Sequence, residues 1–218
     1  MYLSPGKERI LHLYFEDPLL ELHQLAICRQ TDLVPDNVYK FTKAFVEAGW
    51  LLRRKTGQMT FFKANLGNPE LGKIFEGFEV KRREAFLQQR KAIARLLGEL
   101  TERLLEVSQR EIQLVALFGS VARGSWKRGS DIDLLTVTPR ETKATARWFA
   151  AVRRHVEPLL DLAPVNTTVQ QFTEGLRKRT AFYDELWRDR IVLYNEFLFW
   201  RLALEVLTPP LTRWHIHT

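Results

Sequence analysis

The chain has 218 residues, of which 45% are apolar and 27% charged, a composition typical of a globular protein with a core. It excludes disordered and collagen-like sequences, and no apolar run approaches the ~20 residues that a membrane-spanning helix needs. The single cysteine, Cys28, cannot form an internal disulfide. Lys7, Glu8 and Arg9 stand where a signal peptide has its apolar block, so we expect no export signal, no membrane attachment and a cytoplasmic location.

The formal net charge is +7. The excess of basic residues is mild along the whole chain and leans toward the C-terminal half, without a polybasic tail. This distribution suits either nucleic acid or a phosphate-bearing substrate as a partner.

The N-terminal residues predict three short helices followed by a hairpin. The first helix follows Pro5 and Gly6 and ends before Pro18, and the second covers residues 19–29. The third begins at Asp36 or Asn37 and continues to Ala48, before Gly49. Residues 50–63 then form two β-rich runs around a glycine turn, which indicates a hairpin.

This order of elements resembles the winged helix-turn-helix family, as does the sequence Phe45-Val46-Glu47-Ala48-Gly49-Trp50-Leu51. The resemblance implies a DNA-binding domain over residues 1–67, with the third helix in the major groove of duplex DNA and the hairpin against backbone phosphates. The alternative is a dimerisation or docking module whose basic residues are only solvated. The expected DNA-binding residues are Asn37, Tyr39, Lys40 and Lys43 on the helix, and Arg53, Arg54 and Lys55 on the hairpin.

Residues 69–113 have a helical pattern, and we expect a stiff helical connector over residues 68–94. Apolar residues recur three, four or seven positions apart, as in the seam of a coiled coil. The seam predicts either packing within the chain or a contact between two chains. Its residues are Phe86, Ile93, Leu97, Leu100, Leu104 and Val107.

Residues 114–137 carry the motif with the clearest chemical meaning. An apolar strand leads into Gly119-Ser120, ten residues follow, and a second strand carries Asp131 and Asp133. Two carboxylates on one strand face form a hard oxygen site suited to Mg²⁺. Gly119 allows the backbone close to a ligand, and the N–H groups and hydroxyl beside it can hold phosphate oxygens.

This motif is similar to the signature of the DNA polymerase β-like nucleotidyltransferase superfamily, and most similar to the minimal, MntA-type members. The resemblance implies a mixed sheet with helices, two Mg²⁺ ions held by Asp131 and Asp133, and transfer of a nucleoside monophosphate from ATP or another NTP to an acceptor hydroxyl. This sequence departs from the family's pattern at the usual third carboxylate. The aligned position carries Asn166, and Asp161 fits only after a register shift. The remaining residues expected to bind the nucleotide are Gly119, Ser120, Arg123, Lys127 and Ser130.

We therefore expect an α+β protein: a winged helix-turn-helix, a helical connector and a nucleotidyltransferase domain over residues 95–218 with a C-terminal helix. The alternative function is a DNA-binding regulator or antitoxin whose nucleotidyltransferase fold only senses nucleotides. A HEPN-type protein partner follows from the antitoxin resemblance. We also expect a homodimer, built on the seam and on the apolar C-terminal helix.

Overall fold

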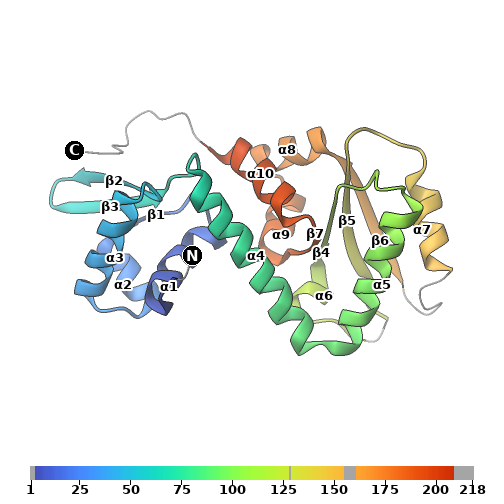
Figure 1. The fold of residues 1–218 in the computed structure, drawn as a ribbon, viewed down its shortest axis with the longest axis horizontal. Helices are drawn as coiled ribbons and strands as arrows, with labels where there is room; N and C mark the ends of the chain where they lie inside the picture. Colours follow the sequence, from blue (N-terminus) through green and yellow to red (C-terminus); the bar gives the residue numbers. More distant parts are fainter. Residues whose placement is uncertain (1–2, 128, 155–160, 209–218) are drawn as a thin grey trace. The chain divides into compact units, whose positions relative to one another are not determined.

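The computed structural model describes residues 3–127, 129–154 and 161–208. The chain divides into two compact units (Figure 1), one comprising Met1–Phe78 together with Leu207–Thr218, the other Glu79–Val206. The boundary between the units falls within α4 (Pro69–Gln89), inside the connector that the sequence predicts at 68–94.

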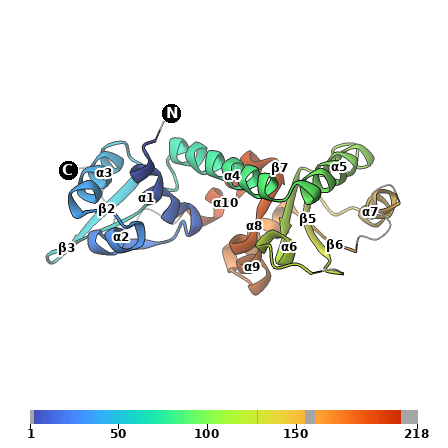
Figure 2. The same cartoon turned by 90° about the horizontal axis from the view of Figure 1, so that it is seen from below.

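Within residues 3–78, the first unit contains α1, α2, α3, the first half of α4 and a three-stranded antiparallel sheet (Figure 2). In chain order the elements are α1 (Pro5–Glu16), β1 (Glu21–His23), α2 (Gln24–Thr31), α3 (Pro35–Glu47), β2 (Leu51–Thr56) and β3 (Met59–Ala64). The sheet order is β1-β3-β2. The core between helices and sheet is fully buried at Tyr14 and Phe15, and the Tyr14 hydroxyl donates to the Phe62 carbonyl at 3.2 Å.

The helices and the hairpin of this unit lie close to where the sequence predicts them, but the second helix was predicted to begin too early. Residues 21–23 pair with β3 instead, with Leu22 opposite Phe62. His23 has an extended backbone and accepts the N–H of Ala26 on its side chain, so it caps α2. The third helix begins at Pro35, whose fixed φ suits a first helical position.

The second unit is built on a four-stranded mixed sheet of order β6-β5-β4-β7. Its strands are β4 (Leu114–Phe118), β5 (Ile132–Thr138), β6 (Leu162–Thr168) and β7 (Ile191–Tyr194). β4 runs antiparallel to β5 and β7, and β5 runs parallel to β6. The helices are α5 (Lys91–Val107), α6 (Gly119–Arg123), α7 (Thr145–Arg153), α8 (Val169–Lys178), α9 (Ala181–Asp189) and α10 (Glu196–Leu207).

Helices cover both faces of this sheet, with α5 and α7 on one face and α8 and α9 on the other (Figure 1). The α5/α7 face buries Val115, Leu117 and Leu134 against Leu100 and Trp148. On the α8/α9 face, the ring of Phe118 meets Phe182 edge to face. This mixed α+β arrangement agrees with the fold class that the nucleotidyltransferase resemblance implies.

The predicted coiled-coil seam lies inside the second unit. The helix breaks at Arg90, which has φ −135° and ψ 58°, and the chain turns there from α4 into α5. Most seam residues are then buried in the core of their own unit, at exposures of 5% or less: Phe86, Leu97, Leu100 and Leu104. The seam is therefore not available as a dimer surface, and an expected homodimer has to use other surfaces.

The apolar side chains of the C-terminal helix are also mostly buried within the chain. Phe199 and Trp200 of α10 are fully buried, whereas Phe197 is 57% exposed. Across the described residues, no helix combines the length and the hydropathy needed to cross a membrane.

Candidate functional site

The two halves of the predicted nucleotide motif meet at one end of β4 and β5. The strands pair antiparallel, with Phe118 opposite Asp133, so the turn after β4 lies beside the start of β5. The sequence predicts that Asp131 lies on the strand. In the structure β5 begins at Ile132, so Asp131 lies just before it. Only Asp133 is held by the strand pairing.

Gly119 is required here both by its backbone and by its neighbour. Its φ is +70°, in the left-handed region that side chains with a Cβ rarely adopt. A Cβ at this position would lie 2.1 Å from Oδ2 of Asp133, which is far inside van der Waals contact. The Ser120 backbone also lowers the pKa of the Asp133 carboxyl. The turn and the carboxylate thus form one contiguous surface.

The carboxylate of Asp133 is only partly exposed and lies near other negative charge. Burial raises the pKa of Asp133, and the charges of Asp131 and Glu185 raise it further, while Arg123 and the Ser120 N–H oppose them. A raised pKa in the folded state means that the ionised form costs folding free energy, so this cost appears as the pH rises through that pKa. A bound cation would offset the cost.

Arg123, which the sequence predicts to bind the nucleotide, joins α6 to α9 in the structure. Its Nη1 donates to Glu185 at 3.2 Å and also to Asp189. The side chain of Asp189 is 2% exposed and pairs with Arg188 as well, at 2.9 Å. Although burial opposes it, these arginines lower the pKa of Asp189, and their own pKa values are raised by the same bonds. Arg123 therefore acts on Asp133 through its charge from within an ion-pair network.

Sequence analysis missed the partners of Arg123. Glu185 and Asp189 are four residues apart on α9 and so lie on one side of that helix. The spacing was visible, but nothing in the sequence shows that this side of α9 faces α6.

The loop between α6 and β5 is tied at two points. The N–H of Ser125 donates to the Ser120 carbonyl at 3.0 Å, and the N–H of Lys127 donates to the Ser130 hydroxyl at 2.9 Å. The side chain of Lys127 is exposed beside the predicted site. The Ser130 hydroxyl is therefore engaged in shaping the loop as well as lying next to Asp131.

Asn166 does not lie where a third carboxylate would be needed. In the parallel pairing of β5 and β6 it is opposite Thr136, whose hydroxyl donates to the Asn166 side chain at 2.9 Å. Side chains alternate along a strand, so Thr136 and Asn166 point to the opposite side of the sheet from Asp133. This placement does not favour Asn166 as the third-position residue, because its side chain and that of Asp133 point to opposite sides of the sheet.

Asp161 is closer to the required place. The N–H of Ile132 donates to the Asp161 carbonyl at 2.8 Å, and β6 begins with Leu162 opposite Ile132. Extending this register by one residue brings Asp161 level with Asp131. Among the described residues, however, no three His, Cys, Asp or Glu side chains group closely enough to hold a metal ion unaided.

The residues predicted to bind DNA lie on the surface of the first unit. Asn37, Tyr39 and Lys40 are exposed on α3, as is Lys43, whose amine is 4.0 Å from Glu47 on the next turn. On the hairpin, the three basic residues differ. Arg53 and Lys55 are exposed, whereas Arg54 pairs with Glu21 on β1 and lies over the Phe61 ring.

A glycine-serine turn against a carboxylate on the adjacent strand is the arrangement that the sequence motif predicts. In agreement, residues 97–197 match the family model of the nucleotidyltransferase domain. Among solved structures, the chain is 22% identical to a Sulfolobus solfataricus protein named "putative nucleotidyltransferase", with a TM-score of 0.29, covering 52% of this chain and 84% of that one. A TM-score this low does not establish a common fold. No curated protein matches the sequence significantly.

Proposed function

We propose that the second unit is a Mg²⁺-dependent nucleotidyltransferase that transfers a nucleoside monophosphate, with ATP as the donor, to a hydroxyl of a protein or small-molecule acceptor. The observation that supports this most is the contact between the Gly119 turn and Asp133. This contact places a backbone turn that would hold phosphates beside a carboxylate whose pKa is raised by burial and by the charges of Asp131 and Glu185. The family match over residues 97–197 supports the same class of reaction.

The residues present fit a magnesium ion. Asp131 and Asp133 offer hard carboxylate oxygens, and their mutual repulsion favours a cation between them. Mg²⁺ is commonly held by one or two carboxylates together with substrate phosphates, so a third protein ligand is not needed for the donor complex. When bound, the ion would neutralise charge on the phosphates and orient the α-phosphorus.

The chain's own residues would serve three purposes. Gly119 and Ser120 would hold the β- and γ-phosphates, and Lys127 would add positive charge at the open side of the site. The acceptor oxygen would form a bond to the α-phosphorus while the bond to the β-phosphate oxygen breaks and pyrophosphate leaves. Asp161, from the start of the neighbouring strand, would take the acceptor's proton.

Titration of ATP and Mg²⁺ into the protein by calorimetry tests the donor site. We expect wild type to bind and the variant Asp131→Ala/Asp133→Ala to bind at least about tenfold more weakly, because loss of the cation leaves the triphosphate charge unscreened. Asn166→Ala is the matched control and should bind as wild type does. Equal affinity of wild type and the double aspartate variant would contradict the site.

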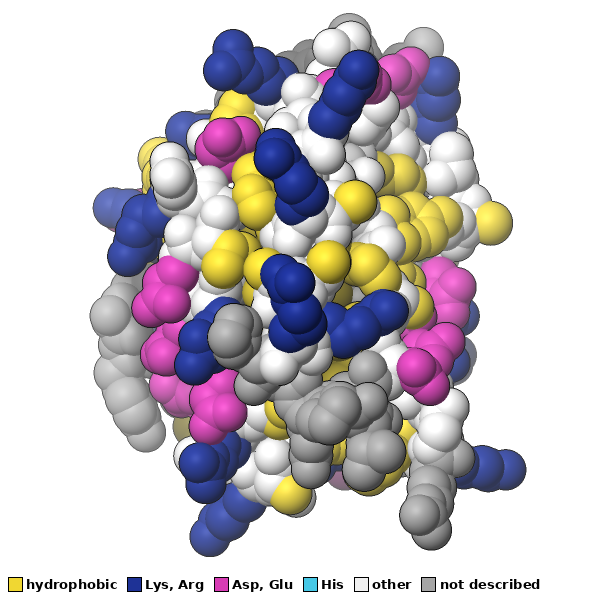
Figure 3. Space-filling model, turned by 90° about the vertical axis from the view of Figure 1, so that its right-hand side faces the viewer, with side chains coloured by type: hydrophobic (Ala, Val, Ile, Leu, Met, Phe, Trp, Pro, Cys, Tyr) yellow, Lys and Arg dark blue, Asp and Glu magenta, His cyan; other side chains and the backbone are white. Residues whose placement is uncertain are grey.

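For the first unit we favour binding of duplex DNA. Its element order resembles that of winged helix-turn-helix domains, and exposed polar and basic side chains lie on both α3 and the hairpin. By contrast, Lys and Arg side chains on the face of the second unit in Figure 3 are distributed among apolar and uncharged atoms, with Asp and Glu toward the edges. The contacts offered by the first unit are largely to phosphates, so affinity should be modest and fall steeply with salt.

We expect Arg53→Ala/Lys55→Ala to weaken binding of a duplex about three- to tenfold at low salt, because two phosphate contacts are lost. Arg54→Ala is the control: this arginine is already paired with Glu21, so its loss should matter less. ATP binding should be unchanged in both variants. Fluorescence anisotropy with a labelled duplex checks this, and a double variant that binds DNA as tightly as wild type would leave the unit as a docking module.

A regulator that senses nucleotides without transferring them is the second candidate, and the exposed basic surface of the first unit favours it. An antitoxin paired with a HEPN-type protein is one form of this candidate. A homodimer, which would display two α3 helices for paired half-sites, remains part of the same proposal. Nucleotide binding without group transfer would support the regulator.

A further inference from the structure

A separate pocket lies at the end of the central sheet away from the proposed donor site. Gln113, which precedes β4, and Asn195, which follows β7, contribute to its lining. The Asp133 end of β4 is at Phe118, four residues from Leu114, or about 13 Å along the strand at ~3.3 Å per residue. The pocket has a volume of about 240 Å³ and belongs wholly to the second unit.

Two arginines from different elements line this pocket. Arg110 comes from the turn after α5 and Arg201 from α10, and both side chains are exposed. Within the described residues, neither guanidinium forms an ion pair with a carboxylate, unlike Arg83, Arg123 and Arg190 of the same unit. Two arginines that form no ion pair and line one pocket favour an anion, and phosphate oxygens match the donor geometry of a guanidinium group.

An exposed aromatic side chain lines the same pocket as the two arginines. Phe197 is 57% exposed, and the guanidinium of Arg201 lies 5.9 Å from its ring centroid. Tyr194, which is half-buried, lines the same pocket. An aromatic ring beside cations is the combination that proteins use to stack a base while holding its phosphate.

The floor of the pocket is fixed by hydrogen bonds. The side-chain amide of Asn195 donates to the Gln113 carbonyl at 2.8 Å, and its oxygen accepts the N–H of Leu198 at 3.1 Å. These bonds join the entry of β4 to the start of α10, so Phe197 and Arg201 are displayed from a rigid element. Binding would then require little ordering of the backbone.

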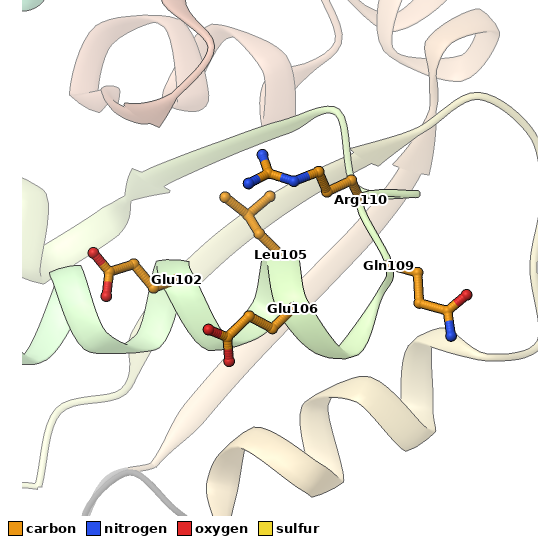
Figure 4. Close-up of a pocket in the computed structure, with 5 residues that line it drawn as sticks. All are labelled: Glu102, Leu105, Glu106, Gln109 and Arg110. Carbon is orange, nitrogen blue, oxygen red and sulfur yellow. The ribbon is translucent and has the colours of Figure 1, made fainter.

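Arg110 also lines a second pocket, of about 390 Å³, on the side of α5. Figure 4 shows its guanidinium over Leu105, with the carboxylates of Glu102 and Glu106 on the preceding turns of the helix. Carboxylates on these turns of α5 can accept hydrogen bonds from hydroxyl or amino groups of a ligand whose anionic end is at Arg110. A nucleotide offers both kinds of group.

We propose that the pocket of Arg110, Phe197 and Arg201 is a second binding site, separate from the donor site, which takes a nucleotide through its phosphate and base. The nucleotide is either free or the unpaired end of a nucleic acid, since both present the same chemistry. The inference rests on the geometry of this pocket and stands whether or not the Asp133 site transfers nucleotides.

The test uses the full chain with Asp131→Ala/Asp133→Ala and EDTA present, so that the donor site does not contribute. The probes are AMP, inorganic phosphate and a 5′-phosphorylated single-stranded decamer, titrated by calorimetry. In this background we expect Arg110→Gln/Arg201→Gln to weaken binding of AMP or the decamer about tenfold or more, and Phe197→Ala to weaken it several-fold. Arg103→Gln, an exposed arginine of α5 outside the pocket, is the matched control.

The probes distinguish the two sources. Binding of AMP that depends on both arginines supports a free nucleotide, and binding of the decamer alone supports a nucleic-acid end. Three results would overturn the proposal: no probe binds, loss of the arginines changes nothing, or inorganic phosphate competes as well as AMP and Phe197→Ala has no effect. Circular dichroism of each variant verifies that the fold is retained.

Discussion

Replacing Arg190 with alanine is expected to lower the free energy of unfolding of the second unit by about 3–5 kcal/mol. Arg190 and Glu79 are both fully buried, and Nε donates to the Glu79 carboxylate at 2.9 Å. The guanidinium also lies over the Trp187 ring at 4.3 Å and donates to the Trp187 carbonyl at 2.5 Å. Without Arg190, the Glu79 charge stays buried with no cation to compensate it.

A double variant distinguishes the loss of the whole ion pair from the loss of only one of its two charges. Glu79→Leu/Arg190→Met removes both charges and replaces them with apolar volume, so it should be markedly more stable than Arg190→Ala. Denaturant unfolding followed by tryptophan fluorescence reports on this part of the chain, because Trp187 and Trp200 pack around Arg190. A loss below about 1 kcal/mol for Arg190→Ala would show that the pair is not essential to the unit.

Gly119→Ala should abolish nucleotidyl transfer, with a loss of about 100-fold or more. The added Cβ would enter the space of the Asp133 carboxylate, and the alanine would also have to adopt a φ of +70°. The strain alone should cost about 1–3 kcal/mol of stability. Movement of the turn away from Asp133 would separate the expected phosphate-binding groups from the carboxylate.

Gly57→Ala is the control for backbone strain. Gly57 also has a positive φ, +59°, but a Cβ there would meet nothing within 4 Å. The control should therefore lose stability without loss of transfer, as measured by product formation per folded protein. Comparable transfer by Gly119→Ala and wild type would show that the contact between the turn and Asp133 is not needed.

The sequence was sufficient for features that depend on neighbouring residues. The Gly119-Ser120 turn and Asp131-Ile132-Asp133 were recognisable because spacing along the chain limits how the two strands can pair. The helices of the first unit were also largely predictable from their periodicity, with Gly49 after the end of the third, although that helix begins at Pro35 rather than at Asp36 or Asn37. β1 was not, because its three residues become a strand only through pairing with β3.

Features that depend on register and on distant partners were not predictable. Asn166 was placed in the third position, and only the pairing with Thr136 shows that it points to the other face. An apolar seam has the same sequence pattern whether it packs within one chain or between two chains. Here the helix breaks at Arg90, and most seam residues pack into the core of the second unit. Arg123 was basic and close to the turn, but its partners come from α9, more than sixty residues further along the chain.

The most direct test of the central proposal is transfer of label from ATP carrying α-³²P, with Mg²⁺, to components of a cell lysate. We predict that wild type and Asn166→Ala transfer the label, that Asp133→Asn does so at least about 100-fold more slowly, and that Asp161→Asn is also impaired. Asn166→Ala controls for general disturbance of the sheet, because its side chain lies on the opposite face from Asp133. Equal transfer by wild type and Asp133→Asn, or binding of ATP by wild type with no transfer to any component, would contradict the proposal.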